Sequence, residues 1–431
     1  MKNKDIEKGN EMKTVVPALR FPEFQGMNGW EKTYIYEECP NPYSGGTPKT
    51  TEKEYYGGNI PFIRSAEIGK DKTELSITQE GLNNSSAKMI QKGDLLIALY
   101  GANSGDIAIS KIDGAINQAI LCLKAKSNNL FIYYTLLKKQ KDIVSKYLQG
   151  GQGNLSGEII KSIDFYIPQE IEQQKIADCF SSLDDLIEAT AQKVETLKEH
   201  KKGLMQRLFP AEGKNVPDLR FPEFRGTSAW EEKRLGDVVE IKGRIGFRGY
   251  TTKDVVEQGD GAISLSPTNI TDNGNLNFEK STYISWEKYE ESPEIQLKKG
   301  YIVLVKTGSS YGKSALVKEL PTKTTVNPQI VVLKPKDGIN EHFISALISH
   351  SMVQRQIKCA VVGGAIPTLS QESISKFDIL YPKKTSHKPS EQEKIADCLS
   401  SLDELIEATS RKVEIFKEHK KGLMQQLFPK I

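Results

Sequence analysis

The feature that most constrains this chain is a segment of 39 residues that occurs twice, at 172–210 and at 391–429. The copies read EQQKIADCFSSLDDLIEATAQKVETLKEHKKGLMQRLFP and EQEKIADCLSSLDELIEATSRKVEIFKEHKKGLMQQLFP, and they differ at eight positions. Apolar residues recur in each copy at the alternating spacing of a coiled-coil seam, over about five heptads. Each copy therefore predicts one helix roughly 54 Å long, at ~1.5 Å per residue, whose seam must pack against another helix.

The seam leaves two kinds of partner open. Its apolar residues are Ile176, Phe180, Leu183, Ile187, Val194 and Leu197 in the first copy, and Ile395, Leu399, Leu402, Ile406, Val413 and Phe416 in the second. Thr190 and Lys201, with Thr409 and Lys420, are polar members that can fix the register. The helices could form the stalk of a homodimer, or they could pair within one chain. We favour pairing within the chain, because each helix follows a large globular segment and would act as a spacer between two heads.

The repeat extends from the helices to a whole half-chain. The lead-in VPALRFPEFQGMNGWEK begins at Val16 and returns as VPDLRFPEFRGTSAWEEK from Val216. Its two prolines exclude a helix interior, so we expect an extended strap anchored by Phe21, Phe24 and Trp30. The predicted organisation is a flexible tail at 1–15, a first head at 16–168, a central helix at 169–210, a linker at 211–215, a second head at 216–388 and a C-terminal helix at 389–431.

Within the heads, short apolar runs bounded by Gly and Pro predict a mixed α and β structure. In the first head we expect a strand at 59–64, a loop up to Gly93, strands at 94–100, 107–109 and 119–123, a helix at 130–149 and a strand ending at Ile167. The second head keeps this order, with GYIVLVKTGSSYG in place of GDLLIALYGANSG and VNPQIVVL in place of INQAILCL. A helix at 340–357 parallels the helix of the first head. We therefore expect one scaffold used twice, with loops that have diverged.

Composition excludes several classes of protein. The chain has 431 residues, 38% of them hydrophobic and 27% charged, which predicts two or three globular domains. No run of about 18 apolar residues occurs, and the charged N-terminus lacks the apolar core of a signal peptide, so we expect no membrane span and no export. Five scattered cysteines without a CxxC predict reduced thiols in the cytoplasm, and the five histidines form no metal-binding pattern.

One motif imitates a phosphate-binding loop. The run GSSYGKS at 308–314 follows an apolar strand, but only three residues separate its glycines, whereas the functional loop needs four. Pro321 also lies where a helix should follow and supply its dipole. The equivalent loop of the first head, GANSG, has no lysine. We find no catalytic constellation of Ser/His/Asp or Cys/His type, so the chain offers little support for an enzyme.

The loops of both heads instead carry side chains suited to DNA. They are Lys49, Lys53, Arg64, Tyr100, Asn103, Ser104, Gln152 and Asn154 in the first head, and Arg244, Arg248, Lys306, Ser309, Tyr311 and Lys313 in the second. Arginine and lysine bind phosphates and guanine edges, whereas asparagine and glutamine suit adenine. Taken singly, each residue also fits an ordinary solvated loop position. Their occurrence on two matched scaffolds favours a DNA-reading surface on each head.

Several of these motifs together resemble a known family. They are SGGTP at 44–48, YYGGNIPFI at 55–63, GDLLIALYGANSGDIAI with INQAI, and the two helices that carry EQxKIADC-x-SSLD-x-LIE. In this order, and twice, they resemble the specificity subunits of type I restriction–modification enzymes, the HsdS family. The resemblance covers 16–431 and implies an α+β fold, in which two similar α/β target recognition domains are separated and linked by an antiparallel coiled coil of the two long helices.

The resemblance also implies a function. Each head would read one half of a bipartite, asymmetric site in double-stranded DNA, and the helix pair would set the gap and dock two HsdM methyltransferase subunits. The chain itself would be non-catalytic and hold no cofactor, whereas HsdM would use S-adenosylmethionine and HsdR restriction subunits would use ATP with Mg. A stand-alone DNA-binding or regulatory protein is the alternative, and an enzyme built on the near-miss phosphate loop is a third reading.

Overall fold

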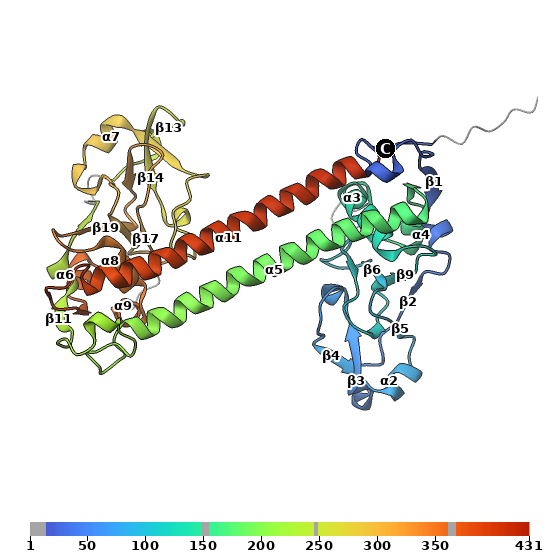
Figure 1. The fold of residues 1–431 in the computed structure, drawn as a ribbon, viewed down its shortest axis with the longest axis horizontal. Helices are drawn as coiled ribbons and strands as arrows, with labels where there is room; N and C mark the ends of the chain where they lie inside the picture. Colours follow the sequence, from blue (N-terminus) through green and yellow to red (C-terminus); the bar gives the residue numbers. More distant parts are fainter. Residues whose placement is uncertain (1–13, 148–154, 245–248, 361–367, 431) are drawn as a thin grey trace, which may run out of the picture. The chain divides into compact units, whose positions relative to one another are not determined.

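The computed structural model describes residues 14–147, 155–244, 249–360 and 368–430. Its contacts divide the chain into two compact units (Figure 1). The first unit comprises Met1–Ala191 with Arg411–Ile431, and the second comprises Gln192–Ser410. Each unit therefore holds one head together with half of each long helix. Among the described residues no helix is both long and apolar enough to cross a membrane.

The first head contains short strands and a few helices. Its strands are β1 (Glu31–Tyr34), β2 (Tyr43–Ser44), β3 (Tyr56–Ile63), β4 (Leu75–Ile77), β5 (Lys88–Ile90), β6 (Leu95–Ala98), β7 (Ile107–Ile109), β8 (Gly114–Ile116), β9 (Ile120–Leu123) and β10 (Asp164–Ile167). Its α-helices are α1 (Ile35–Glu38), α2 (Gln79–Asn83), α3 (Asn129–Tyr147) and α4 (Gly157–Lys161). Two four-stranded sheets result, ordered β2-β9-β6-β7 and β4-β3-β8-β5, while β1 pairs with β10.

The second head repeats the strand order of one sheet and differs in the edge strand of the other. Its strands are β11 (Glu231–Arg234), β12 (Val239–Gly243), β13 (Val255–Val256), β14 (Gly261–Leu265), β15 (Thr282–Ser285), β16 (Ile302–Val305), β17 (Ser314–Leu316), β18 (Thr324–Val326), β19 (Ile330–Pro335) and β20 (Asp378–Tyr381). Its α-helices are α6 (Leu235–Val238), α7 (Trp286–Glu290), α8 (Glu341–Ser349), α9 (Ser351–Cys359) and α10 (Gln371–Ser375). The sheets are ordered β12-β19-β16-β17 and β13-β15-β14-β18. One strand pair per head is parallel, β3 with β8 and β14 with β18.

The central strand of each head is apolar throughout because it serves two cores. In β6, Leu95 and Ile97 join the cluster that contains α3, whereas Leu96 and Ala98 join the cluster between the two sheets. Strand β16 divides its residues between two clusters in the same way. Successive side chains of a strand point to opposite faces, so a strand covered on both faces reads as a continuous apolar run.

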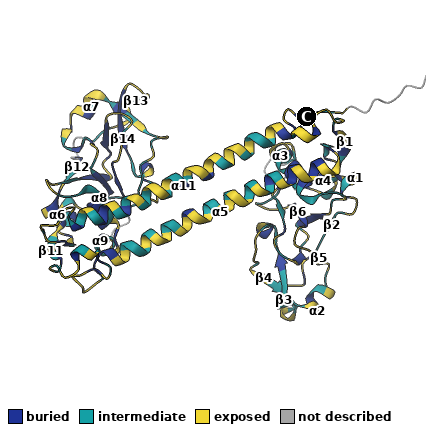
Figure 2. Ribbon diagram, in the orientation of Figure 1, coloured by how far each residue is buried: buried dark blue, intermediate teal, exposed yellow. Residues whose placement is uncertain are grey.

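The long helices are α5 (Glu170–Leu208) and α11 (Glu391–Leu427). Their predicted seam positions are buried or half-buried, while many of the other positions are exposed (Figure 2). In the second unit Lys201 of α5 bonds Asp403 of α11, with Nζ and Oδ1 2.5 Å apart. In the first unit Lys420 of α11 makes the equivalent bond to Asp184 of α5, also at 2.5 Å. Within each unit the two helices run antiparallel (Figure 1), and a lysine of the seam is held by the opposite helix.

A strap ahead of each head fastens the ends of these helices. In the first unit the Arg20 guanidinium donates to both carboxylate oxygens of Glu172 near the start of α5, at 2.8 and 2.6 Å. Backbone carbonyls of Met27 and Asn28 accept its remaining bonds. The second unit makes the same contacts between Arg220 and Glu391 at the start of α11. Both pairs are buried, which explains why the lead-in is repeated so closely in sequence.

Two expectations about the heads were wrong in detail. The expected loop up to Gly93 contains β4, α2 and β5, elements of three to five residues that are too short to show a period. The single helix expected at 340–357 is divided into α8 and α9 at His350. That residue is extended, with φ −70° and ψ 150°, and its ring stacks on Phe209 with centroids 5.1 Å apart. A tertiary contact therefore interrupts a segment whose local pattern is helical.

The buried Arg20–Glu172 pair, here called the clamp, predicts that two isosteric substitutions differ greatly in their effect on stability. We expect Glu172→Gln to lower the free energy of unfolding of the first unit by about 3–5 kcal/mol, because it leaves the buried Arg20 charge uncompensated. The control Glu414→Gln removes an exposed pair with Lys417 and should cost about 0–0.5 kcal/mol. Thermal and urea unfolding of the purified chain measure both variants. Equal losses in the two variants would contradict the clamp.

Candidate nucleic-acid interface

The hairpin between β6 and β7 in the first head and the hairpin between β16 and β17 in the second have the same backbone shape but different side chains. Between β6 and β7 the turn begins at Gly101 and ends at Gly105, with φ of +84° and +93°. Between β16 and β17 the turn is bounded by Gly308 and Gly312, at +100° and +83°. Glycine supplies these left-handed conformations without strain. The strand β17, not a helix, follows the second turn, so the GSSYGKS run has no helix N-terminus behind it.

The structure distributes the candidate DNA contacts over three environments. Exposed side chains are those of Lys49, Lys53, Tyr100 and Ser309, and half-buried ones are those of Arg64, Asn103, Ser104, Lys306, Tyr311 and Lys313. Arg244 is buried, and its guanidinium donates to the Val326 carbonyl oxygen and to Thr325 Oγ1. Gln152, Asn154 and Arg248 lie outside the described residues. The environment of Arg244 is that of an arginine supporting the sheet, so we assign it no contact.

Some of the candidates already have partners within their loops. Ser104 Oγ donates to the Leu99 carbonyl oxygen at 2.8 Å, and Asn103 donates to Asp106 at 3.0 Å, so both shape the turn in which they lie. Lys313 Nζ is 2.6 Å from Asp272, in an exposed pair. Such a surface pair contributes about 0–1 kcal/mol and is readily exchanged for a phosphate.

Lys306 is the most unusual side chain of the second head. It follows β16 at the place that the buried Leu99 takes after β6, and both residues make matching backbone bonds, to Ala119 and Leu155 in the first head and to Gln329 and Leu369 in the second. Burial lowers the pKa of Lys306, and no carboxylate of the described chain pairs with it. A half-buried cation without a counter-ion costs stability. Lys306 Nζ is not among the buried side-chain atoms without a partner, so its ammonium reaches solvent and is available to an anion or a base edge.

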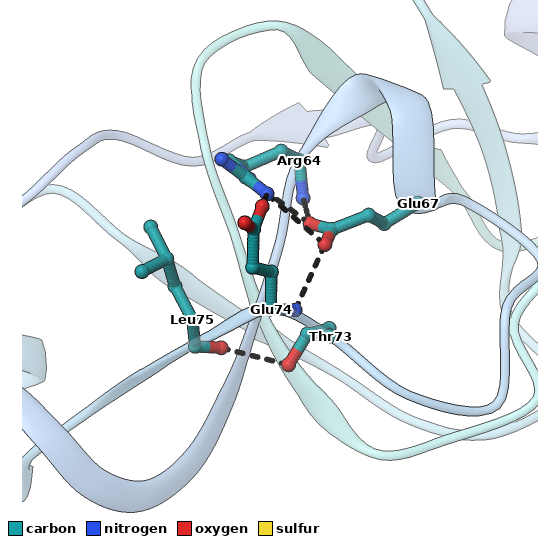
Figure 3. Close-up of polar contacts among 5 residues, drawn as sticks. All are labelled: Arg64, Glu67, Thr73, Glu74 and Leu75. Carbon is teal, nitrogen blue, oxygen red and sulfur yellow. Dashed lines mark hydrogen bonds and ion pairs between the residues drawn. The ribbon is translucent and has the colours of Figure 1, made fainter. Parts of the chain in front are cut away.

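Arg64 is held by two carboxylates (Figure 3). Its Nε and Nη2 donate to the two oxygens of Glu67 at 3.1 and 3.2 Å, and Nη2 also contacts Glu74. Burial opposes the ionisation of Glu67, but bonds from Arg64 and from the backbone N–H groups of Glu74 and Arg64 outweigh it and lower the pKa of Glu67. Neither carboxylate was predicted as a site residue from the sequence, although an acidic residue three positions after Arg64 is the spacing of a capping box.

A groove in the second unit collects further basic residues. It has a volume of about 790 Å³ and is lined by the second head and by the segments of α5 and α11 that belong to this unit. Tyr311 and Lys313 of the hairpin face it together with Lys198 and Lys202 of α5. The two helix lysines were not predicted as site residues, because on a charged helix they read as solvated flank positions. Across the described residues no cluster of His, Cys, Asp and Glu could hold a metal ion.

Comparisons with known proteins identify the family to which this chain belongs. The model of the type I restriction modification DNA specificity domain matches the chain at 27–199 and again at 227–415. The chain therefore belongs to this family and carries its domain twice. The MjaVIII specificity subunit of a type I restriction enzyme from Methanocaldococcus jannaschii is 23% identical over 423 residues, 95% of this chain and 93% of that protein. The MjaIX specificity subunit of the same organism is 25% identical, covering 89% of each chain.

Solved structures show the same fold. The S subunit of a type I restriction–modification system from M. genitalium superposes with a TM-score of 0.61 at 16% identity, covering 97% of this chain and 100% of that one. A chain from a study of complex assembly and conformational transition of the type I R-M system gives a TM-score of 0.52 at 15% identity, covering 93% and 98%. The α+β fold and the coiled coil expected from the sequence are confirmed.

Lys306 occupies the position that Leu99 has in the first head, and this predicts that replacing the lysine affects stability and DNA binding in opposite directions. We expect Lys306→Leu to leave the thermal midpoint unchanged or raised, because it removes an uncompensated half-buried charge. The same change should weaken binding to the DNA site by about 1–3 kcal/mol if the side chain contacts a base.

A matched lysine controls for charge. Lys376→Leu removes an exposed lysine that is paired with Glu372 in the same unit, and it should leave DNA affinity unchanged. Fluorescence anisotropy at several salt concentrations measures binding, and a change in the salt dependence alone would indicate a phosphate contact. Wild-type affinity of the Lys306 variant at every salt concentration would contradict the assignment.

Proposed function

We propose that this chain is the DNA-recognition subunit of a type I restriction–modification complex and that it catalyses no reaction itself. The carrying observation is the duplication: two heads with closely similar topology, each continuous with a long helix, and with different side chains on matching turns. Matching scaffolds with divergent loops suit the reading of two different half-sites. Family membership supports the same conclusion.

The long helices would set the distance between half-sites. Support comes from the lysine–aspartate pairs, which hold the register of α5 against α11 in both units. Two more features of the helices, the buried seam and the clamped starts, make each of them a stiff element rather than a flexible linker. A stiff connection converts helix length into spacing along DNA.

The catalytic work would belong to partner subunits. We infer that HsdM methyltransferase subunits dock on this chain and use S-adenosylmethionine, and that HsdR restriction subunits use ATP with Mg. The resemblance of the whole chain to specificity subunits supports this division of labour. The chain's own role would be to bring those subunits to one asymmetric sequence in double-stranded DNA.

Exchange of one head tests whether the half-sites are read separately. Replacing residues 230–382 by the corresponding head of a related specificity subunit should change one half of the modified motif and leave the other half and the gap as they were. Methylation-aware sequencing of DNA from cells that contain the chain and its partner subunits measures the motif. A chimera that changes both halves would rule out modular reading.

Lengthening both helices tests the spacer. The boundary between the units falls after Ala191 in α5 and after Ser410 in α11, so duplicating residues 188–191 and 407–410 leaves the contacts within each unit as they are. Four residues add ~6 Å and about one turn, which nearly keeps the helix face. At ~3.4 Å per base pair, the recognised gap should lengthen by one to two pairs with both half-site sequences unchanged.

The linker between the first long helix and the second strap is the control for this test. Four residues inserted at 211–215 lie outside both α5 and α11, so they should leave the gap unchanged. The same sequencing of modified DNA applies to all variants. An unchanged gap in the helix variant, or half-sites that change with it, would show that the helices do not set the spacing.

A further inference from the structure

Arg64 and its two carboxylates form a polar cluster at the end of a strand in the first head. Arg64 follows β3 directly, and the turn after it, η3 (Ser65–Glu67), ends at the buried Glu67. The exposed fractions of the side chains rise from 6% for Glu67 to 38% for Arg64 and 75% for Glu74. The cluster is therefore anchored inside the head and open at its outer end.

The Arg64 guanidinium is hydrogen-bonded along its Nε–Nη2 edge, whereas its Nη1–Nη2 end is only partly occupied. Nε and Nη2 donate to Glu67, so the side-on pair of donors is occupied. The second hydrogen of Nη2 is given to Glu74, while Nη1 makes no bond to any described residue (Figure 3). Nη1 and Nη2 are the two donors that an arginine presents end-on to the paired O6 and N7 acceptors of guanine. Glu74 holds one of the two positions that such an edge would take.

The second head shows that the turn does not need this charge pair. Its equivalent turn, η7 (Pro267–Asn269), has Asn269 in place of Glu67 and Ser266 in place of Arg64. Asn269 Oδ1 accepts from the Ser266 N–H at 2.9 Å, as Glu67 accepts from the Arg64 N–H at 3.1 Å. An uncharged amide thus shapes the turn equally well. The carboxylate of Glu67 and the guanidinium of Arg64 are additions to the scaffold of the first head.

The charge of the cluster distinguishes a base from a phosphate. Arg64 contributes one positive charge against two negative charges from Glu67 and Glu74. A phosphate would meet repulsion from both carboxylates, whereas the edge of guanine is neutral and offers two acceptors. Exposed Lys70 and Lys72 on the same loop are better placed to meet phosphates.

We propose that Arg64 reads a guanine in the half-site of the first head. In this proposal Glu67 orients the Arg64 guanidinium, and the Glu74 carboxylate occupies the position of the base until DNA displaces that carboxylate. This rests on the proposed function and names the base class that one residue reads. The exposed contact with Glu74 is worth at most about fivefold in affinity. A bidentate contact with guanine is worth about 5- to 150-fold, so the base displaces the carboxylate.

The test uses the full chain with its partner methyltransferase subunits and begins with the wild-type motif. Methylation-aware sequencing should show at least one guanine in the half-site assigned to the first head by the head exchange. Arg64→Ala should relax one guanine position there, lose about 5- to 150-fold in preference for that base, and leave the other half-site intact. Glu67→Gln should relax the same position, and Glu74→Gln should keep the motif with equal or up to about fivefold tighter binding.

Modified bases and a matched arginine sharpen the result. Replacing that guanine by 7-deazaguanine removes the N7 acceptor and should weaken wild-type binding but not that of Arg64→Ala. The control Arg234→Ala removes an exposed arginine paired with Asp378 in the second head and should change neither half-site. Thermal midpoints equal to wild type show that each variant is folded.

Two outcomes would decide against the proposal, and a third concerns the proposed function instead. An unchanged motif for Arg64→Ala overturns the assignment of Arg64. Equal weakening on all sequences, with a shallower salt dependence, identifies a phosphate contact and overturns base reading. If the wild-type complex modifies no bipartite motif, the proposed function fails before Arg64 is tested.

Discussion

Two buried arginine–glutamate pairs connect the heads of this protein to its long helices. Arg20 with Glu172, and Arg220 with Glu391, use both oxygens of the carboxylate, and two backbone carbonyls accept further bonds from each guanidinium. Each strap also caps the end of the other long helix, since the N–H of Leu19 donates to Gln426. Within each unit these bonds fix the ends of the long helices to the head beside them.

The two heads carry different side chains at a small number of matching positions on turns of the same backbone shape. Paired glycines at positive φ give both hairpins one shape, while the residues between them differ. Where the first head has the buried Leu99, the second has the half-buried Lys306. Where the second has Asn269, the first has Glu67 with Arg64. The two heads therefore differ in the groups that matching turns present rather than in the shape of those turns.

The sequence predicted the long elements well and the short ones less well. The central helix begins and ends within two residues of the expected 169–210, and the C-terminal helix begins two residues after and ends four residues before the expected 389–431, because five heptads of apolar spacing leave little freedom. β6 and α3 were likewise found close to their expected positions. The segment of β4, α2 and β5 was missed because three-residue strands take their pairing from neighbours far along the chain. The break at His350 depends on Phe209, which is distant in sequence.

By itself the sequence determined the duplication, the seam, the scaffold order and the family, since all of these follow from periodicity and repeated motifs. Only the tertiary structure decided the environment of single polar residues. It buried Arg244 against β18, left Lys306 half-buried with no carboxylate partner among the described residues and placed two carboxylates beside Arg64. The physical reason is that an arginine or lysine has the same local pattern in all three settings. Its charge is balanced or exposed by groups that the fold brings from elsewhere, and those groups decide whether it supports the protein or is free to meet DNA.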